Sequence, residues 1–235
     1  MGHETLVLCA LVVVGGSMSD LWEEIYRKET KTYKWTPSDS VVNFLPVLKD
    51  ISAHKVLDVG CGTGRNALFL GKEGFIVVGI DISKTALQVA DQKIKNEGLH
   101  NIILLQGDIA DLPFPPQHFD AIISTNVIHH TKINDIKKIV NEIYDVLCHD
   151  GKGLVTVVAD MDYKFGKGRR LEENTYELSE EAHREKGMIH HFFNEFETRA
   201  LFNKFEILTT RLLQKDVEEG RSYHWEVTFS KSKSR

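Results

Sequence analysis

Short apolar stretches alternate with amphipathic ones along most of the chain. The apolar stretches are rich in Val, Ile and Leu at consecutive positions, which is typical of strands covered on both faces. They lie at 56–59, 75–80, 102–106, 119–124 and 154–159. The segments at 67–73, 84–97 and 133–147 have apolar residues at helical spacing. This alternation predicts a parallel sheet with right-handed helical crossovers.

The pattern changes at both ends of this block. Before it, the spacing predicts one amphipathic helix over 20–30 and a second that begins near Ser38 or Asp39. After it, residues 161–188 are polar and glycine-containing, as expected of a functional or mobile insertion. A helix at 194–202 and two final strands at 205–213 and 223–229 complete the prediction.

A glycine-rich turn follows the first predicted strand. Gly60, Gly62 and Gly64 precede the apolar positions of the next helix. Glycine lets a ligand approach the backbone closely, and a helix N-terminus attracts polar or negative groups. Nicotinamide-binding turns place a third Gly or Ala three residues after the second glycine. If the pattern begins at Gly60, that position is Arg65 and does not match. If it begins at Gly62, the position is Ala67 and matches.

Acidic residues stand at three successive strand ends. Asp58 precedes the glycine turn, Asp81 ends the second strand and Asp108 follows the third. This set suits a cationic, ribose-bearing ligand without phosphate, since Asp58 would repel a pyrophosphate. Together with the glycine turn, it resembles the motifs of class I S-adenosylmethionine-dependent methyltransferases. The resemblance extends from about residue 55 to residue 158.

The resemblance implies an α/β, Rossmann-like fold. The expected sheet is mainly parallel and seven-stranded, with one antiparallel edge strand and helices on both faces. One methyltransferase domain is expected over 18–235, with N-terminal lid helices at 18–50 and an acceptor-side cap at 161–190. The two final strands are expected to form an antiparallel pair.

The resemblance also assigns the cofactor, S-adenosyl-L-methionine, to named residues. Asp58 would help to hold its ammonium group, Asp81 would bind both ribose hydroxyls, and Asp108 would accept from the adenine amino group. The other expected contacts are Gly60, Cys61, Gly62, Ile82, Ile109 and Asn126. Considered singly, each aspartate also fits a helix cap or a turn.

Several residues are candidates for contact with a methyl acceptor. Gly64-Arg65-Asn66 is similar to a pattern in methyltransferases of the tellurite-resistance type, so Arg65 could meet the cofactor carboxylate or an anionic acceptor. Tyr33 and Trp35 precede the first strand and could belong to a lid or pack on the sheet edge.

Two histidine pairs are the remaining candidates for chemistry. His129 and His130 follow the fourth strand, where the resemblance places the transferred methyl, and His190 and His191 follow the insertion. His129 and His191 are candidate bases because histidine titrates near neutral pH. His130 and His190 are candidates for acceptor contact, and all four also fit structural roles. A metal would need further ligands that the sequence does not identify, so no metal site is predicted.

Composition narrows the class of protein. The chain has 235 residues, 29 Lys and Arg against 34 Asp and Glu, and therefore no basic surplus typical of nucleic-acid binding. Three widely spaced cysteines favour a reducing, cytoplasmic compartment. No apolar stretch is long enough for a membrane-spanning helix. Residues 1–17, which precede a second methionine, are expected to be a leader outside the domain.

The sequence thus predicts methyl transfer in line from S-adenosylmethionine to a small-molecule acceptor. A small acceptor is preferred because no appended RNA- or protein-binding domain is recognisable. A protein or RNA acceptor and a non-catalytic cofactor-binding scaffold are the alternatives. A nicotinamide-dependent enzyme is disfavoured by Asp58. The oligomeric state is left open.

Overall fold

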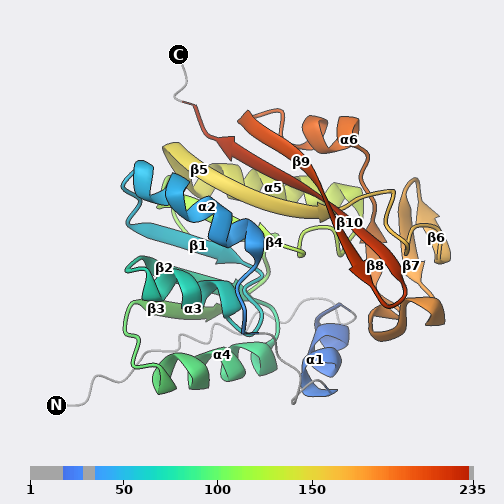
Figure 1. Cartoon of the computed structure of the whole chain (residues 1–235), viewed down its shortest axis with the longest axis horizontal. Helices are drawn as coiled ribbons and strands as arrows, with labels where there is room; N and C mark the ends of the chain where they lie inside the picture. Colours follow the sequence, from blue (N-terminus) through green and yellow to red (C-terminus); the bar gives the residue numbers. More distant parts are fainter. Residues whose placement is uncertain (1–17, 29–34, 233–235) are drawn as a thin grey trace.

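A seven-stranded sheet forms the centre of the protein. The computed structural model describes residues 18–28 and 35–232. The strands of the sheet are β1 Lys55–Val59, β2 Ile76–Asp81, β3 Ile102–Gln106, β4 Phe119–Thr125, β5 Leu147–Val158, β9 Glu206–Val217 and β10 Gly220–Ser230. Their order is β3-β2-β1-β4-β5-β10-β9 (Figure 1). Strands β1 to β5 are parallel, whereas β10 is antiparallel to both β5 and β9.

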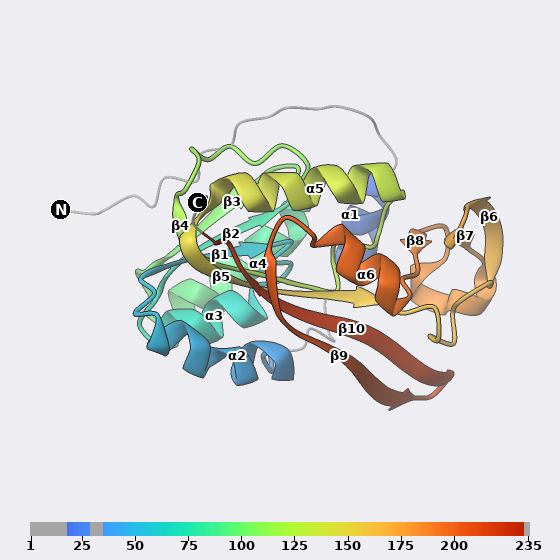
Figure 2. The same ribbon diagram turned by 90° about the horizontal axis from the view of Figure 1, so that it is seen from above.

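The expected fold class and the antiparallel final pair are confirmed. The reversed strand, β10, lies second from the edge, and β9 is the edge strand. Helices cover both faces of the sheet. They are α1 Met18–Lys28, α2 Asp39–Asp50, α3 Arg65–Lys72, α4 Lys84–Asn96, α5 Ile133–Val146 and α6 Glu195–Leu201. Figure 2 shows α5 on one face of the sheet and α2 and α3 on the other.

Strand β1 shows why the central strands are apolar at consecutive positions. Val56 packs in the core cluster formed with α2, α3 and α4, whereas Leu57 and Val59 pack in the cluster formed with α5. Successive side chains of a strand point to opposite faces, and here both faces are covered. The run of consecutive apolar residues therefore indicates a strand that is buried on both faces.

Strand β5 begins earlier than the sequence predicts. The prediction placed a turn at 150–153 and the strand at 154–159, but β5 starts at Leu147 and includes those residues. Gly153 pairs with both Ile122 and Phe229 across the sheet, and the Phe229 ring occupies the space of a side chain at position 153. This glycine allows close packing within a strand rather than a turn.

The insertion after β5 contains a second, smaller sheet that the sequence pattern did not predict. Its antiparallel strands are β6 Gly168–Glu172, β7 Thr175–Leu178 and β8 Ile189–His191. A 3-10 helix, η1 Glu180–Glu185, connects β7 to β8. These strands have three to five residues each, too few for a two-residue period to stand out in a polar segment.

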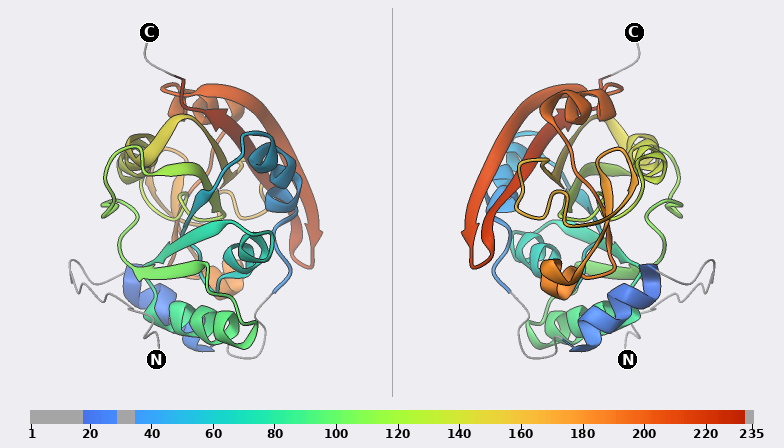
Figure 3. Two further views of the ribbon diagram at one scale, coloured as in Figure 1. Left: turned by 90° about the vertical axis from the view of Figure 1, so that its left-hand side faces the viewer. Right: turned by 90° about the vertical axis from the view of Figure 1, so that its right-hand side faces the viewer.

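The topology creates a crevice at one edge of the main sheet. From β1 the chain continues to β2 and β3 on one side and later to β4 on the other. Ligands of open α/β sheets bind outside the carboxyl ends of the strands at such a reversal. Helix α1 lies at this edge and packs beside α4, as the two end-on views in Figure 3 show.

Candidate functional site

A cavity of about 950 Å3 opens at the crevice, between the glycine turn and the insertion. It has two parts that differ in chemistry. The carboxylate half is lined by Gly60, Cys61, Gly62, Asp81, Ile82, Asp108 and Ile109. The histidine half is lined by His129, His130, Tyr163, Lys164, Glu185 and His224. Arg65 and Asn126 also line the cavity.

Asp81 holds the glycine turn in place. Its Oδ2 accepts a hydrogen bond from the Gly62 N–H (2.8 Å) and its Oδ1 accepts one from the Ser83 N–H (2.9 Å). Burial raises the pKa of Asp81, and these two hydrogen bonds oppose that effect. Each carboxylate oxygen keeps a second lone pair, so the group that shapes the turn can also accept from a ligand.

Asp58 is buried beneath the turn and does not line the cavity. Among the described residues its Oδ2 has no hydrogen-bond partner. Burial raises the pKa of Asp58 to about 7, and the nearby Arg65 guanidinium opposes this shift. A buried carboxylate with an unsatisfied oxygen is costly for the protein. A ligand that brings positive charge to this place would offset the cost.

Asp108 has a different environment from the other two aspartates. It lies on the open part of the carboxylate half, where it is exposed to solvent. Its Oδ1 accepts a hydrogen bond from the Ala110 N–H at 2.8 Å, which is the local turn that its position after β3 permits. The assignment of Asp108 to the adenine amino group stays a prediction.

The loop after β4 connects the two halves. Asn126 adopts a left-handed backbone conformation (φ +60°). The Thr156 hydroxyl accepts from the Asn126 N–H and donates to the Asn126 side-chain oxygen, both at 2.9 Å. The Asn126 carbonyl in turn accepts from His130 Nε2 at 3.1 Å. These bonds fix the direction of the chain just before the histidine pair.

Four histidines gather on the far side of that loop. The ring of His130 lies 4.2 Å from that of His129 and 4.4 Å from that of His190, measured between centroids. His224 lies 5.9 Å from His129. Burial lowers the pKa of all four, to about 4 for His130 and His224. The cluster is therefore made of neutral imidazoles at neutral pH.

The insertion adds a partly buried ion pair beside the histidines. Lys164 Nζ lies 2.7 Å from Glu185 Oε2, and the same oxygen lies 3.8 Å from His190 Nε2. The Lys164 side chain is only 8% exposed. Since one charge would be costly at this depth, the pair keeps the region close to neutral. The insertion thus contributes to the lining of the histidine half.

Helix α1, part of the segment predicted to form lid helices, bridges the two halves through Trp22 and Tyr26, which the sequence did not identify as site residues. The Trp22 ring packs edge-on against His130 at 4.9 Å, and the Tyr26 hydroxyl lies over Gly62. Glu23 accepts hydrogen bonds from the N–H groups of Lys84 (2.7 Å) and Thr85 (3.2 Å) at the start of α4. The spacing of Trp22 and Tyr26, four residues apart on one helix, was the available signal.

Besides Asp58, the sequence candidates Trp35, His190 and His191 do not line the cavity. Trp35 is exposed, and the Lys93 ammonium lies 5.4 Å from its ring. His191 Nδ1 lies 2.7 Å from Thr175 Oγ1 and its Nε2 lies 3.1 Å from Glu197 Oε1, so its ring nitrogens are used within the protein. Tyr33 and the expected leader, residues 1–17, lie outside the described residues. His190 belongs to the histidine cluster but is buried behind the lining.

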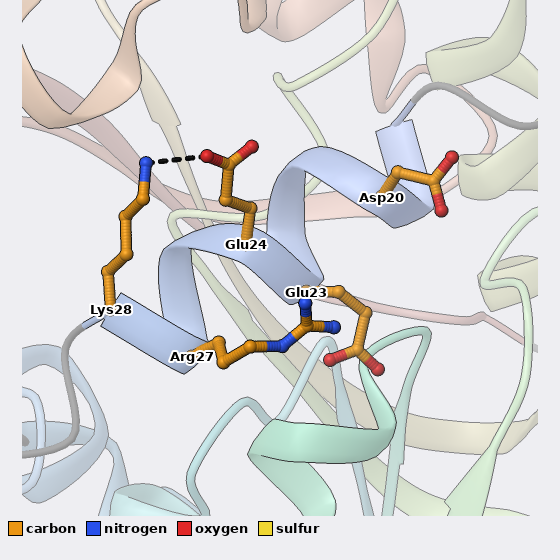
Figure 4. Close-up of a pocket in the computed structure, with 5 residues that line it drawn as sticks. All are labelled: Asp20, Glu23, Glu24, Arg27 and Lys28. Atoms are coloured by element: carbon orange, nitrogen blue, oxygen red, sulfur yellow. Dashed lines mark hydrogen bonds and ion pairs between the residues drawn. The ribbon is translucent and has the colours of Figure 1, made fainter.

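A second hollow, of about 510 Å3, lies along α1 (Figure 4). Its walls are Asp20, Glu23, Glu24, Arg27 and Lys28. Lys28 pairs with Glu24 one helical turn away, and both are exposed. Pairs of this kind are ordinary features of a solvated helix face and do not converge on a ligand position.

Comparison with known proteins gives a consistent result. Residues 56–151 match the family model of the methyltransferase domain. An uncharacterised methyltransferase of Bacillus subtilis, YcgJ, is 35% identical over 102 residues, which are 43% of this chain and 40% of that protein. The chain therefore spans well under two thirds of the length of this relative.

Solved structures share the fold over nearly the whole chain. An S-adenosylmethionine-dependent methyltransferase of Methanosarcina mazei has a TM-score of 0.71 at 20% identity, covering 80% of this chain and 98% of that one. The 1,6-didemethyltoxoflavin-N1-methyltransferase of Burkholderia thailandensis, solved with its substrate and S-adenosylhomocysteine, has a TM-score of 0.66 at 17% identity, covering 94% of each chain. None of the described helices combines the length and apolar character needed to cross a bilayer.

Proposed function

Because residues 56–151 match the family model of the methyltransferase domain and the chain has the fold of class I S-adenosylmethionine-dependent methyltransferases, we propose that this protein transfers a methyl group from S-adenosylmethionine to a small-molecule acceptor. The observation that carries the proposal is the carboxylate half of the cavity. It combines a glycine turn held by Asp81 with the unsatisfied, buried carboxylate of Asp58.

The residues of this half fit the cofactor group by group. S-adenosylmethionine carries an ammonium group, a ribose with two hydroxyls and an adenine, but no phosphate. The charge of the ammonium would offset the desolvation of Asp58, directly or through a water molecule. The two oxygens of Asp81 would accept from the two ribose hydroxyls. Asp108 would accept from the adenine amino group, with Ile82 packing on the ring.

The chain's own contribution to the reaction is mainly positioning. The bound cofactor supplies the activated methyl group and its leaving group. Helix α1 covers the cavity through Trp22 and Tyr26, which would exclude water and align the acceptor with the methyl. Asn126 lies where the two halves meet and would line the point of transfer. Arg65 would meet a carboxylate of the cofactor or the acceptor.

The shape of the histidine half supports a small acceptor. It is bordered by α1, by the insertion and by β10, and three of its lining residues, His129, His130 and Lys164, are buried. A compact molecule with one nucleophilic atom fits a pocket of this size.

Product formation tests the proposal. The purified protein would be incubated with S-adenosylmethionine and panels of small thiols, phenols, amines and chalcogen oxyanions, with protein and RNA panels beside them. Mass spectrometry would measure S-adenosylhomocysteine and the methylated product. We expect turnover with a small acceptor and none by the Asp81→Ala variant. Turnover with macromolecules alone would overturn the acceptor class, and cofactor binding without turnover on any panel would favour the scaffold alternative.

A further inference from the structure

We propose that His129, His130 and His190 form a binding site for a divalent transition metal of the Zn2+ type in the histidine half of the cavity. One ring nitrogen from each of these residues lies within 4.8 Å of the others. The three side chains come from the loop after β4 and from β8, and each is no more than 7% exposed. Neutral imidazoles are favoured ligands of zinc, copper, iron and nickel.

The hydrogen bonding of His130 leaves a nitrogen suited to a metal. Its Nε2 can only donate to the Asn126 carbonyl, so the proton resides there and Nδ1 carries a free lone pair. This Nδ1 is buried and has no partner among the described residues. Metal-bound histidines commonly donate their second ring N–H to a backbone carbonyl, which orients the ring. His130 already has that arrangement.

His190 provides the stronger evidence when it is compared with its neighbour. Both histidines of the pair are buried, but His191 uses its two nitrogens toward Thr175 and Glu197. Neither ring nitrogen of His190 has a hydrogen-bond partner within the described parts of the chain. An unsatisfied buried polar group costs about 1–3 kcal/mol. Both histidines belong to β8, and both ring nitrogens of His191 have partners. The buried ring of His190, which lacks hydrogen bonds, is therefore best explained by a ligand.

The surrounding charges can accommodate a cation. Lys164 is near the histidines, but its ammonium is paired with Glu185, whose carboxylate lies 3.8 Å from His190 Nε2. The carboxylate would attract the cation without being one of its ligands. Ligand nitrogens around zinc, at about 2.0–2.1 Å from the metal, lie roughly 3.4 Å apart. Because the three nitrogens lie within 4.8 Å of one another, binding would draw them together by up to about 1.4 Å.

The cavity defines which side of the metal remains accessible. His129 and His130 line the cavity and His190 lies behind them. Three protein ligands with one open position are typical of catalytic rather than structural zinc sites. The open position would take an acceptor atom with a lone pair, such as a thiolate or a phenolate oxygen. This last role rests on the proposed methyl transfer, whereas the metal site itself does not.

Metal binding to the isolated protein tests the site. The full chain would be treated with a chelator, exchanged into buffer and titrated with Zn2+ by calorimetry. A parallel titration with Co2+ would follow the visible absorption of a tetrahedral site. No cofactor or acceptor is present, so a failure of methyl transfer cannot be confused with a failure of this proposal. We expect one metal ion per chain.

A pair of neighbouring variants provides the control. His190→Gln should weaken Zn2+ binding by more than the roughly 10–100-fold that loss of an outer-shell partner costs, while His191→Gln should leave it unchanged. Circular dichroism would establish that both variants are folded. If His190→Gln does not fold, His130→Gln at the cavity lining is measured instead, with the same expectation. Wild-type protein that binds no Zn2+, or variants at His190 or His130 that bind as tightly as wild type, would overturn the site.

Discussion

The two halves of the cavity are built in different ways. The carboxylate half comes from one continuous part of the chain, between Asp58 and Ile109, in which each aspartate lies at or just after the end of a strand. The histidine half gathers side chains from the loop after β4, from the insertion and from β10. The first is specified by local motifs, and the second by tertiary packing. A sequence pattern can therefore describe one half well and the other hardly at all.

The halves also differ in how their polar groups are satisfied. In the carboxylate half, Asp81 is bonded to two backbone N–H groups and shapes the turn that it serves. In the histidine half, His190 and one nitrogen of His130 have no partner among the described residues. Asp58 Oδ2 is the corresponding unsatisfied atom of the carboxylate half, so a ligand would complete groups in both halves. The difference is that Asp81 already fixes the backbone turn of the first half before any ligand arrives.

Replacement of Asp81 should have the largest effect and should separate the halves. Asp81→Ala removes the two charge-assisted hydrogen bonds proposed to the ribose hydroxyls, worth about 1.5–3 kcal/mol each, so the affinity for S-adenosylhomocysteine should fall at least about 100-fold. Calorimetry measures this directly. Zn2+ binding should be unaffected, because no described contact links Asp81 to the histidines. Wild-type affinity for the cofactor product in the variant would refute the assignment of Asp81.

A substitution at Gly60 should show that the halves meet at the glycine turn. Gly60 has φ +70°, and a Cβ there would collide with the side chain of Val127 in the loop before His129. Gly60→Ala should destabilise the protein by about 2–4 kcal/mol, from left-handed backbone strain plus overpacking. Gly98 has a similar φ of +67° with nothing within 4 Å, so Gly98→Ala carries the strain alone. Equal losses in urea unfolding would show that the contact with Val127 is unimportant.

Replacement of Asp58 should raise the stability of the protein and weaken cofactor binding. Its folded-state pKa of about 7 exceeds the ordinary 3.8, so the unfolding free energy falls as pH rises through that window. Asp58→Asn should therefore stabilise the ligand-free protein at pH 8 by about 1–3 kcal/mol, with little gain near pH 4. The same variant should bind the cofactor more weakly, because it cannot pair with the ammonium. Urea unfolding at several pH values would measure the first effect, and a pH-independent difference would contradict it.

Helix α1 should make the smallest contribution, shared by both halves. Glu23→Gln weakens the attachment of α1 to the start of α4, where a carboxylate also interacts favourably with the helix dipole. We expect a loss of less than about 1 kcal/mol, or roughly threefold in cofactor affinity. Glu24→Gln, which loses only an exposed pair with Lys28, is the matched control. Identical cofactor affinities of the two variants would contradict a contribution of the α1–α4 attachment to cofactor binding.

The parts predictable from the sequence are those with a local physical cause. The burial of β1 on both faces produced its run of apolar residues, and Ser83 caps α4 through its side chain as its position before that helix predicts. The glycine turn and its three aspartates are brought to one edge because each ends a parallel strand. These features follow from periodicity and from turn chemistry.

The rest depended on contacts that no local pattern contains. The strands of the insertion are short and polar, and Gly153 was taken as a turn residue because the ring of Phe229 is far away in sequence. The sequence indicates Trp35 as a lid candidate and not Trp22, whose position becomes evident only when α1 packs beside His130. The sequence predicted no metal site because His130 and His190, now neighbours, are separated by 60 positions.

The measurement that tests the central claim most directly is ligand binding by the purified chain. Calorimetry and native mass spectrometry would detect it. S-adenosylmethionine, S-adenosylhomocysteine and NAD would be compared under the same conditions. The carboxylate half predicts that both sulfur-containing ligands bind, at one per chain, and that NAD does not, because Asp58 lies under the turn that its pyrophosphate would occupy. Binding of NAD without binding of either sulfur-containing ligand would contradict the proposed function.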